Sequence, residues 1–181
     1  MSKAATTTKA KPAAKAKAPD KKTNGIDRSA PSLTPHIVCR GAAKAIDFYK
    51  KAFGAAELMR LPAPDGRLMH AAVQINGAMV MLNDEMPEHK ALSPLALRGT
   101  PVTLHLNVPD VDAVFARAVK AGATVTMPVA DMFWGDRYGI VTDPFGHSWS
   151  IATHKKDMTV EQIQAALKTM GNPDCPDAAQ M

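Results

Sequence analysis

The feature that most constrains the fold of this chain is an internal repeat. A pattern that predicts strand, helix and three strands begins near residue 33 and begins again near residue 101. The helical stretches AAKAIDFYKKAFG and DVDAVFARAVKAG end on Gly54 and Gly122, which are 68 residues apart, and Phe48 precedes Phe115 by 67. We therefore expect an α+β fold with two tandem βαβββ modules, at about 33–86 and 101–155.

The two predicted helices carry recognisable signals at their ends and along one face. In the first, Ile46, Tyr49 and Phe53 fall on one apolar stripe, which a helix buries against a sheet. Gly54 is a favourable C-terminal cap because it adopts the left-handed conformation without strain. Asp110 is a favourable N-cap of the second helix.

The strand candidates alternate between an apolar and a polar face. Asn76-Gly77 between two apolar runs predicts a two-residue hairpin turn, which fixes the register by pairing Ile75 with Ala78. The expected core face comprises Ile37, Cys39, Met69, Ala71, Val73, Ile75, Val80, Leu82, Leu104, Leu106, Trp149 and Ile151. The opposite face collects imidazoles, amides and hydroxyls rather than Lys and Glu, so we expect it to line a cup.

The segments outside the modules differ in character. Residues 1–31 are a Lys/Ala/Pro-rich stretch without large apolar residues between Met1 and Ile26, and we expect a disordered tail. The chain's formal charge is +5, but residues 1–30 hold +6 and the rest about −1. The domain is expected over 32–156. Within 157–181, Thr159 and Gln162 form a capping box for a C-terminal helix, which should dock on its own domain or on a second subunit.

Composition also limits the classes of partner and location. The folded part is not basic, so nucleic-acid binding is not expected except weakly through the tail. No apolar run reaches the ~20 residues that a membrane span requires. Cys39 and Cys175 lie in no paired motif, which favours a reducing, cytoplasmic setting. We expect a homodimer.

Several motifs, taken in order, point to a known family. The paired modules, AIDFYKKAFG, MFWGDRYG, DPFGHSW and ATH resemble the vicinal oxygen chelate superfamily, and its PhnB-like branch most. The resemblance spans about residues 33–170. Members of this superfamily include glyoxalase I, extradiol dioxygenases and bleomycin-resistance proteins, so it implies a β-lined cup that binds a small molecule.

The resemblance also implies where a metal would be held. Metal-using members take one ligand from the first and one from the last strand of each module, which here fall near His36 (or Thr34), Met81, Thr103 and Ser150. A thioether and two hydroxyls are poor ligands for hard or borderline divalent ions. We therefore expect no metal and no other cofactor.

The predicted function is metal-independent binding of an anionic or aromatic small molecule. Arg40 or Arg137 would meet an anionic group, and Trp134 to Tyr138 would form a loop over the cup. The other reading of that loop is that Trp134 fills the core and Asp136 pairs with Arg137. The expected ligand-binding residues are His36, Arg40, His70, Gln74, Met81, Asn83, His105, Asn107, Trp134, Arg137, Tyr138 and Ser150.

Two alternative functions remain open at this point. The first is a divalent-metal-dependent lyase or isomerase of the glyoxalase type, in which His36, His70 and His105 form a shifted three-nitrogen site. Histidines that line a pocket as hydrogen-bonding groups are commoner. The second is an interaction module whose basic tail contacts nucleic acid. No catalytic residue can be named.

Overall fold

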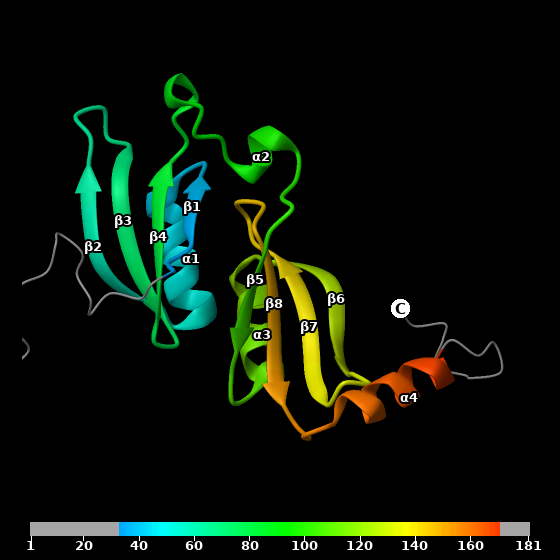
Figure 1. The fold of residues 1–181 in the computed structure, drawn as a ribbon. Helices are drawn as coiled ribbons and strands as arrows, with labels where there is room; N and C mark the ends of the chain where they lie inside the picture. Colours follow the sequence, from blue (N-terminus) through cyan, green and yellow to red (C-terminus); the bar gives the residue numbers. More distant parts are fainter. Residues whose placement is uncertain (1–32, 171–181) are drawn as a thin grey trace, which may run out of the picture. The chain divides into compact units, whose positions relative to one another are not determined.

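The computed structural model describes residues 33–170, and its framework is two four-stranded sheets, one from each module (Figure 1). The strand orders are β1-β4-β3-β2 and β5-β8-β7-β6. In each module the first strand runs parallel to the last. This arrangement confirms the predicted α+β fold of two βαβββ modules. The predicted tail of residues 1–31 lies outside the described residues, as do residues 171–181.

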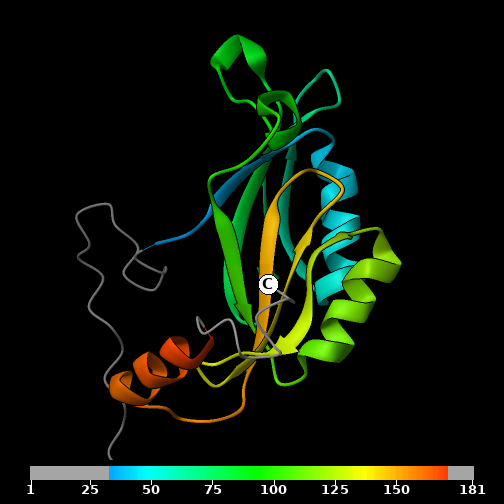
Figure 2. The same ribbon diagram turned by 90° about the vertical axis from the view of Figure 1, so that its right-hand side faces the viewer.

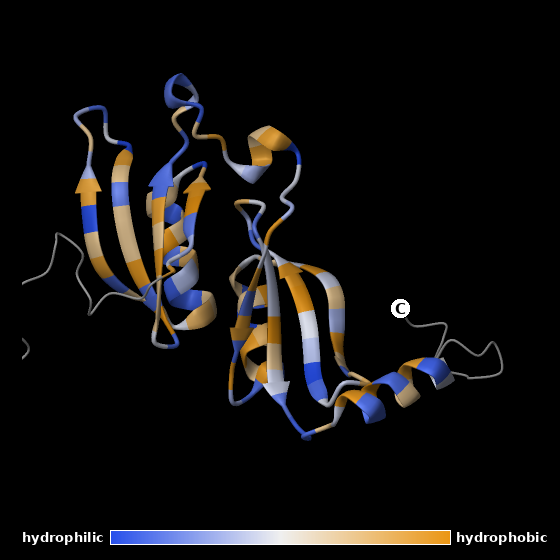
Figure 3. Ribbon diagram, in the orientation of Figure 1, coloured by the Kyte–Doolittle hydropathy of each residue, from blue (hydrophilic) through white to orange (hydrophobic). Residues whose placement is uncertain are grey.

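The elements follow the expected order within each module. The strands are β1 (His36–Cys39), β2 (Ala56–Pro62), β3 (Leu68–Ile75), β4 (Ala78–Asp84), β5 (Thr103–Asn107), β6 (Thr124–Asp131), β7 (Asp136–Thr142) and β8 (Ser148–His154). The helices are α1 (Ala42–Phe53), the 3-10 turn η1 (Pro87–His89), α2 (Pro94–Leu97), α3 (Val111–Ala121) and α4 (Val160–Met170). The short α2 lies in the connection between the modules and is strongly hydrophobic (Figure 3).

A carboxylate at the end of β4 fixes the start of α1. Asp84 Oδ1 accepts hydrogen bonds from the backbone N–H groups of Gly41 (2.9 Å) and Ala42 (2.7 Å), and its Oδ2 accepts one from Leu68 N (2.7 Å). A negative charge is favourable at a helix N-terminus, where backbone N–H groups lack helical partners. Asp84 thus joins β4, α1 and β3.

The core lies between the helices and one face of each sheet. α1 covers the first sheet and α3 the second, both on the same side of the strands, and the two helices pack against each other (Figure 2). A single hydrophobic cluster runs through both modules and contains every predicted core-face residue except Met69 and Leu104, and the partly buried Leu104 packs against it. Met69 is 54% exposed because the pairing shifts between Leu61 and Pro62, which leaves it in a bulge.

The turn between β7 and β8 connects the two modules through a buried carboxylate. Asp143 is 3% exposed and accepts four hydrogen bonds. Tyr49 Oη of α1 donates to Oδ2 at 2.8 Å, and Trp149 Nε1 donates to the same oxygen at 3.0 Å. The backbone N–H groups of Phe145 and His147 donate to Oδ1, both at 2.9 Å. The DPFGH motif is therefore a structural element of the interface between modules.

The C-terminal helix α4 begins with the predicted capping box. Thr159 N donates to Gln162 Oε1 (2.9 Å), and Gln162 N donates to Thr159 Oγ1 (3.3 Å). The apolar stripe of this helix remains exposed, at 65% for Val160 and 54% for Leu167. Within residues 33–170, α4 forms no extensive contact with another helix or strand. No helix in that range is long and apolar enough to cross a membrane.

Candidate functional site

The face of each sheet that points away from the helices is called here its open face. On the first sheet, one row of register partners crosses all four strands: Met59 pairs with Ala72, Ala72 with Met81, and Met81 with His36. Ala72 is only 3% exposed although it lies on this face, so the larger neighbouring side chains cover it. The row is therefore a contiguous surface of two thioethers and an imidazole.

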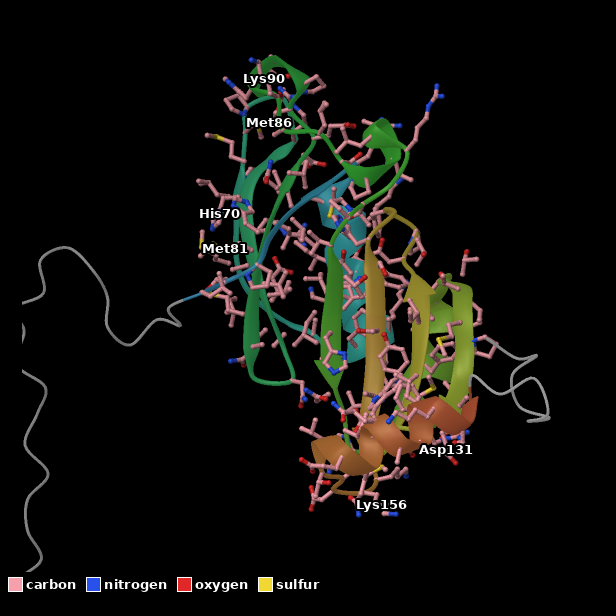
Figure 4. All side chains as sticks on the ribbon, turned by 45° about the vertical axis from the view of Figure 1, so that its right-hand side comes forward. His70, Met81, Met86, Lys90, Asp131 and Lys156 are labelled. Carbon is pink, nitrogen blue, oxygen red and sulfur yellow. The ribbon has the colours of Figure 1, made fainter. Side chains whose placement is uncertain are left out.

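A second imidazole joins this row from β3. The His36 and His70 rings meet edge to face, with centroids 5.6 Å apart. Because β1 and β3 are separated by β4, the two rings must lean toward each other over β4, where Met81 lies. His70 and Met81 project to the same side of the sheet (Figure 4). The structure thus brings together three of the predicted residues.

Two other predicted residues of the first module take different positions. Gln74 pairs with Met79 near the hairpin, as the predicted register requires, and its side chain is exposed. Asn83 is buried and its Nδ2 donates to the backbone oxygen of Asp84 at 2.8 Å. The side chain of Asn83 therefore bonds to the backbone at the end of β4, and Gln74 lies at the hairpin end of the open face.

The open face of the second sheet is built around His105. Its Nδ1 forms a hydrogen bond with Ser150 Oγ (2.8 Å), and its Nε2 forms one with Asn107 Oδ1 (3.1 Å). Both ring nitrogens are thus engaged by neutral groups. The imidazole stacks on Tyr138, with centroids 6.2 Å apart and an interplanar angle of 20°.

The aromatic surface continues from Tyr138 to the turn before β7. Trp134 packs edge-on against Tyr138 at 5.6 Å, and its Nε1 donates to Asp136 Oδ2 (2.9 Å). The other oxygen of Asp136 contacts Nδ1 of His154 (2.8 Å). Only Trp134 lies in the turn, because β7 already begins at Asp136. The expected loop over the cup is therefore mostly strand, and Trp134 and Tyr138 form a half-buried aromatic ledge with His105.

His154 is an unpredicted member of this group. Besides Asp136, it contacts Asp157 Oδ1 through Nε2 at 2.9 Å. Hydrogen bonds to these two carboxylates raise the pKa of His154 above its usual value. Asp157 is only three residues from His154, whereas Asp136 is 18 residues away and joins it through the pairing of β7 with β8, which no local sequence pattern shows.

The register of the strands corrects one equivalence between the modules. His36 pairs with Met81, and His105, not Thr103, pairs with Ser150. Thr103 pairs with Ser148, one step further along the face. His105 is therefore the counterpart of His36, two residues beyond the position expected from the sequence.

The two arginines expected to meet an anionic ligand are both paired with carboxylates. Arg40 Nε contacts Glu85 Oε2 at 2.8 Å. Arg137 contacts Asp112 at 2.7 Å and Asp131 at 3.2 Å. The alternative expectation, an ion pair between Asp136 and Arg137, is not met, because Asp136 contacts His154 and Arg137 contacts Asp112 and Asp131. Neither guanidinium joins the histidines or the aromatic ledge.

The pockets along residues 33–170 give no support to the expected common cavity around all three cup histidines, which stays a prediction. His36 lines a mostly apolar pocket of about 300 Å³ with Leu104 and His147 under α2. Arg137 lines a different pocket of about 570 Å³ beside Asp131 and Lys156. His70 and His105 line neither pocket.

Comparison with known proteins decides the family. A family model of the Glyoxalase/Bleomycin resistance protein/Dioxygenase superfamily matches residues 30–151. The chain belongs to this superfamily. An uncharacterized protein of Mycobacterium bovis is 54% identical over 145 residues, which cover 78% of this chain and 95% of that protein.

Solved structures share the superfamily fold. TioX from Micromonospora sp. ML1 has a TM-score of 0.56 at 28% identity, covering 69% of this chain and 99% of TioX. A Bacillus cereus PhnB protein, described as a putative 3-demethylubiquinone-9 3-methyltransferase, has a TM-score of 0.55 at 19% identity, covering 68% of this chain and 99% of that protein. The second likeness shows the fold alone.

The donor set at the superfamily's metal positions does not fit a divalent ion. With His105 as the counterpart of His36, these positions hold His36, Met81, His105 and Ser150. The set contains no carboxylate, and both nitrogens of His105 already have hydrogen-bond partners. Within residues 33–170, no three His, Cys, Asp or Glu side chains are grouped as metal ligands. The shifted three-histidine site is therefore not formed in the described part of the chain.

Proposed function

We propose that the protein binds a planar, aromatic small molecule on the open face of the second module. The observation that carries this proposal is the ledge of Trp134, Tyr138 and His105, flanked by Ser150 and Asn107. Aromatic rings stack favourably on one another, and the exposed amide of Asn107 can orient a polar substituent of the ligand. This reading needs no divalent metal. The arginine pairs argue for an aromatic rather than an anionic ligand.

The test is a thermal-shift screen of metabolites and aromatic antibiotics, followed by titration calorimetry of the ligands that stabilise the protein. Tyr138→Ala should weaken binding of such a ligand about tenfold, since a stacked pair contributes about 0.5–1.5 kcal/mol beyond area burial. Arg40→Ala is the control and should leave affinity unchanged. Equal affinity in wild type and Tyr138→Ala would place the ligand elsewhere.

Tryptophan fluorescence gives a second readout. The chain has two tryptophans, and Trp149 is buried in the core at 3% exposure while Trp134 lies on the ledge. A ligand on the ledge should quench Trp134 and leave Trp149 unaffected. Quenching should therefore disappear in Trp134→Phe. Added EDTA should change neither quenching nor affinity.

We propose further that two copies of the chain associate through α4. Val160 and Leu167 of α4 are exposed, and α4 forms no extensive contact with another helix or strand among the described residues, so a second subunit is the expected partner. Val160→Asp combined with Leu167→Asp should convert a dimer into a monomer in light scattering. A monomeric wild type would refute this arrangement. The buried thiol of Cys39 supports the proposed cytoplasmic location.

The alternative of a nucleic-acid-contacting tail concerns residues outside the described part of the chain. Its test is a comparison of nucleic-acid binding by the full chain and by a chain without residues 1–30. The glyoxalase-like alternative has no donor set to support it at the positions described above.

A further inference from the structure

The open face of the first module carries uncharged nitrogen and sulfur donors. His36 and His70 converge over β4, and Met81 is the register partner of His36 on that strand. Met59 extends the row on β2, across the buried Ala72. Neither imidazole is hydrogen-bonded to another group among residues 33–170, in contrast to His105.

This donor set has a definite preference among metals. Thioether sulfur is a soft ligand that selects Cu(I) over Mg, Mn or Zn, and imidazole also accepts copper. Asp84, the acidic residue at the end of β4, is occupied by backbone N–H groups at the starts of α1 and β3. A neutral set of nitrogen and sulfur donors suits a monovalent ion, whose charge needs no carboxylate to balance it.

We propose that His36, His70 and Met81 form a binding site for a soft monovalent metal ion, Cu(I) or its analogue Ag(I), with Met59 as a further sulfur donor. The same thioether that makes this position unsuitable for the superfamily's divalent ions makes it suitable for a soft one. The site lies within one module and is independent of the aromatic ledge, so either proposal can fail without the other.

The second module provides the internal comparison. His105 and Ser150 occupy the positions of His36 and Met81, but a hydroxyl replaces the thioether and the imidazole nitrogens are both engaged. The fold and the strand register are the same in both modules. Any difference in metal affinity between the two modules should therefore follow from the side chains that donate to the metal.

The experiment is an anaerobic titration of the full chain with Cu(I) held by a coloured chelator. The Cys175→Ala background is used throughout, because a thiolate outside the described residues would compete for Cu(I), whereas Cys39 is fully buried. We expect a single Cu(I) per chain and a much weaker response to Zn(II). X-ray absorption should show both nitrogen and sulfur around the metal.

Variants locate the site. Met81→Leu, His36→Gln and His70→Gln should each lower the Cu(I) affinity at least about tenfold, since even groups behind the ligands change metal affinity by 10–100-fold. His105→Gln is the matched control and should have no effect. The proposal is overturned if Met81→Leu binds Cu(I) like the parent, if His105→Gln loses binding equally, or if no Cu(I) is withdrawn from the chelator.

Discussion

Replacement of Tyr49 by Phe removes a single hydrogen bond from the interface between the modules. Tyr49 is fully buried, and its hydroxyl donates to Asp143 Oδ2 at 2.8 Å. A hydrogen bond to a charged group contributes about 1.5–3 kcal/mol to stability. Because Trp149 still donates to the same oxygen, the carboxylate keeps a partner, and the loss should lie at the lower end.

The expected loss in the free energy of unfolding is therefore about 1.5 kcal/mol, which corresponds to about 3–6 °C in Tm for a chain of this size. Urea denaturation followed by circular dichroism measures the first quantity and calorimetry the second. Tyr138→Phe is the control, because that ring lies on the open face with no hydroxyl partner among the described residues. The control should change stability by less than about 0.5 kcal/mol.

A double variant tests the shared acceptor directly. Trp149→Phe also removes one donor to Asp143 Oδ2, and the two changes together leave that buried oxygen unpaired. The combined loss should exceed the sum of the two single losses by about 1 kcal/mol or more, since an unpaired buried group costs its full desolvation. Additive losses, or a Tyr49→Phe variant as stable as wild type, would refute the proposed role of Asp143.

Two further predictions concern the turn and strand end beside the aromatic ledge. Gly135→Ala should lower the free energy of unfolding by more than about 2 kcal/mol, because φ is +101° and a Cβ would collide with the backbone oxygen of Lys156. Gly66→Ala is the control, because its φ is also positive, at +87°, but a Cβ there would meet open space, and it should cost only about 1–2 kcal/mol. Urea denaturation measures both losses. For His154, the folded state stabilises the charged ring, so this stabilisation is complete below about pH 6.5 and is lost as the pH rises through the raised pKa. An NMR titration should place that pKa above 6.5 in wild type and lower in Asp136→Asn; equal values would contradict the contact.

The order of elements and most of the core could be predicted from the sequence because both depend on local patterns. Alternation along the strands reports which face is buried, and the Asn76-Gly77 turn fixes the register of the first hairpin. Met69 was placed wrongly because a bulge between β2 and β3 shifts the pairing by one residue. Nothing in the apolar pattern marks that position, since a bulge depends on the partner strand.

The site was less predictable because its geometry depends on contacts between distant segments. The pairs of Arg137 with Asp112 and Asp131 join residues of α3, β6 and β7, which no spacing rule connects. The equivalence of His36 and His105 required the pairing of each with its last strand, since the segments between the first strand and the helix differ in length, with residues 40–41 in one module and 108–110 in the other. Residue types on the open faces were predictable, but their partners were not.

The two open faces have the same backbone arrangement but carry different side chains. Both present a histidine on the first strand opposite a residue of the last strand, held by the same parallel pairing. In the second module a hydroxyl and an amide saturate the ring and an aromatic side chain stacks on it, which favours a planar organic ligand. In the first module a thioether lies beside the ring and a second imidazole converges on it, which favours a soft metal ion. Because the backbone supplies the same positions twice, we propose that the side chain opposite each histidine, Met81 or Ser150, sets the kind of ligand that each face prefers.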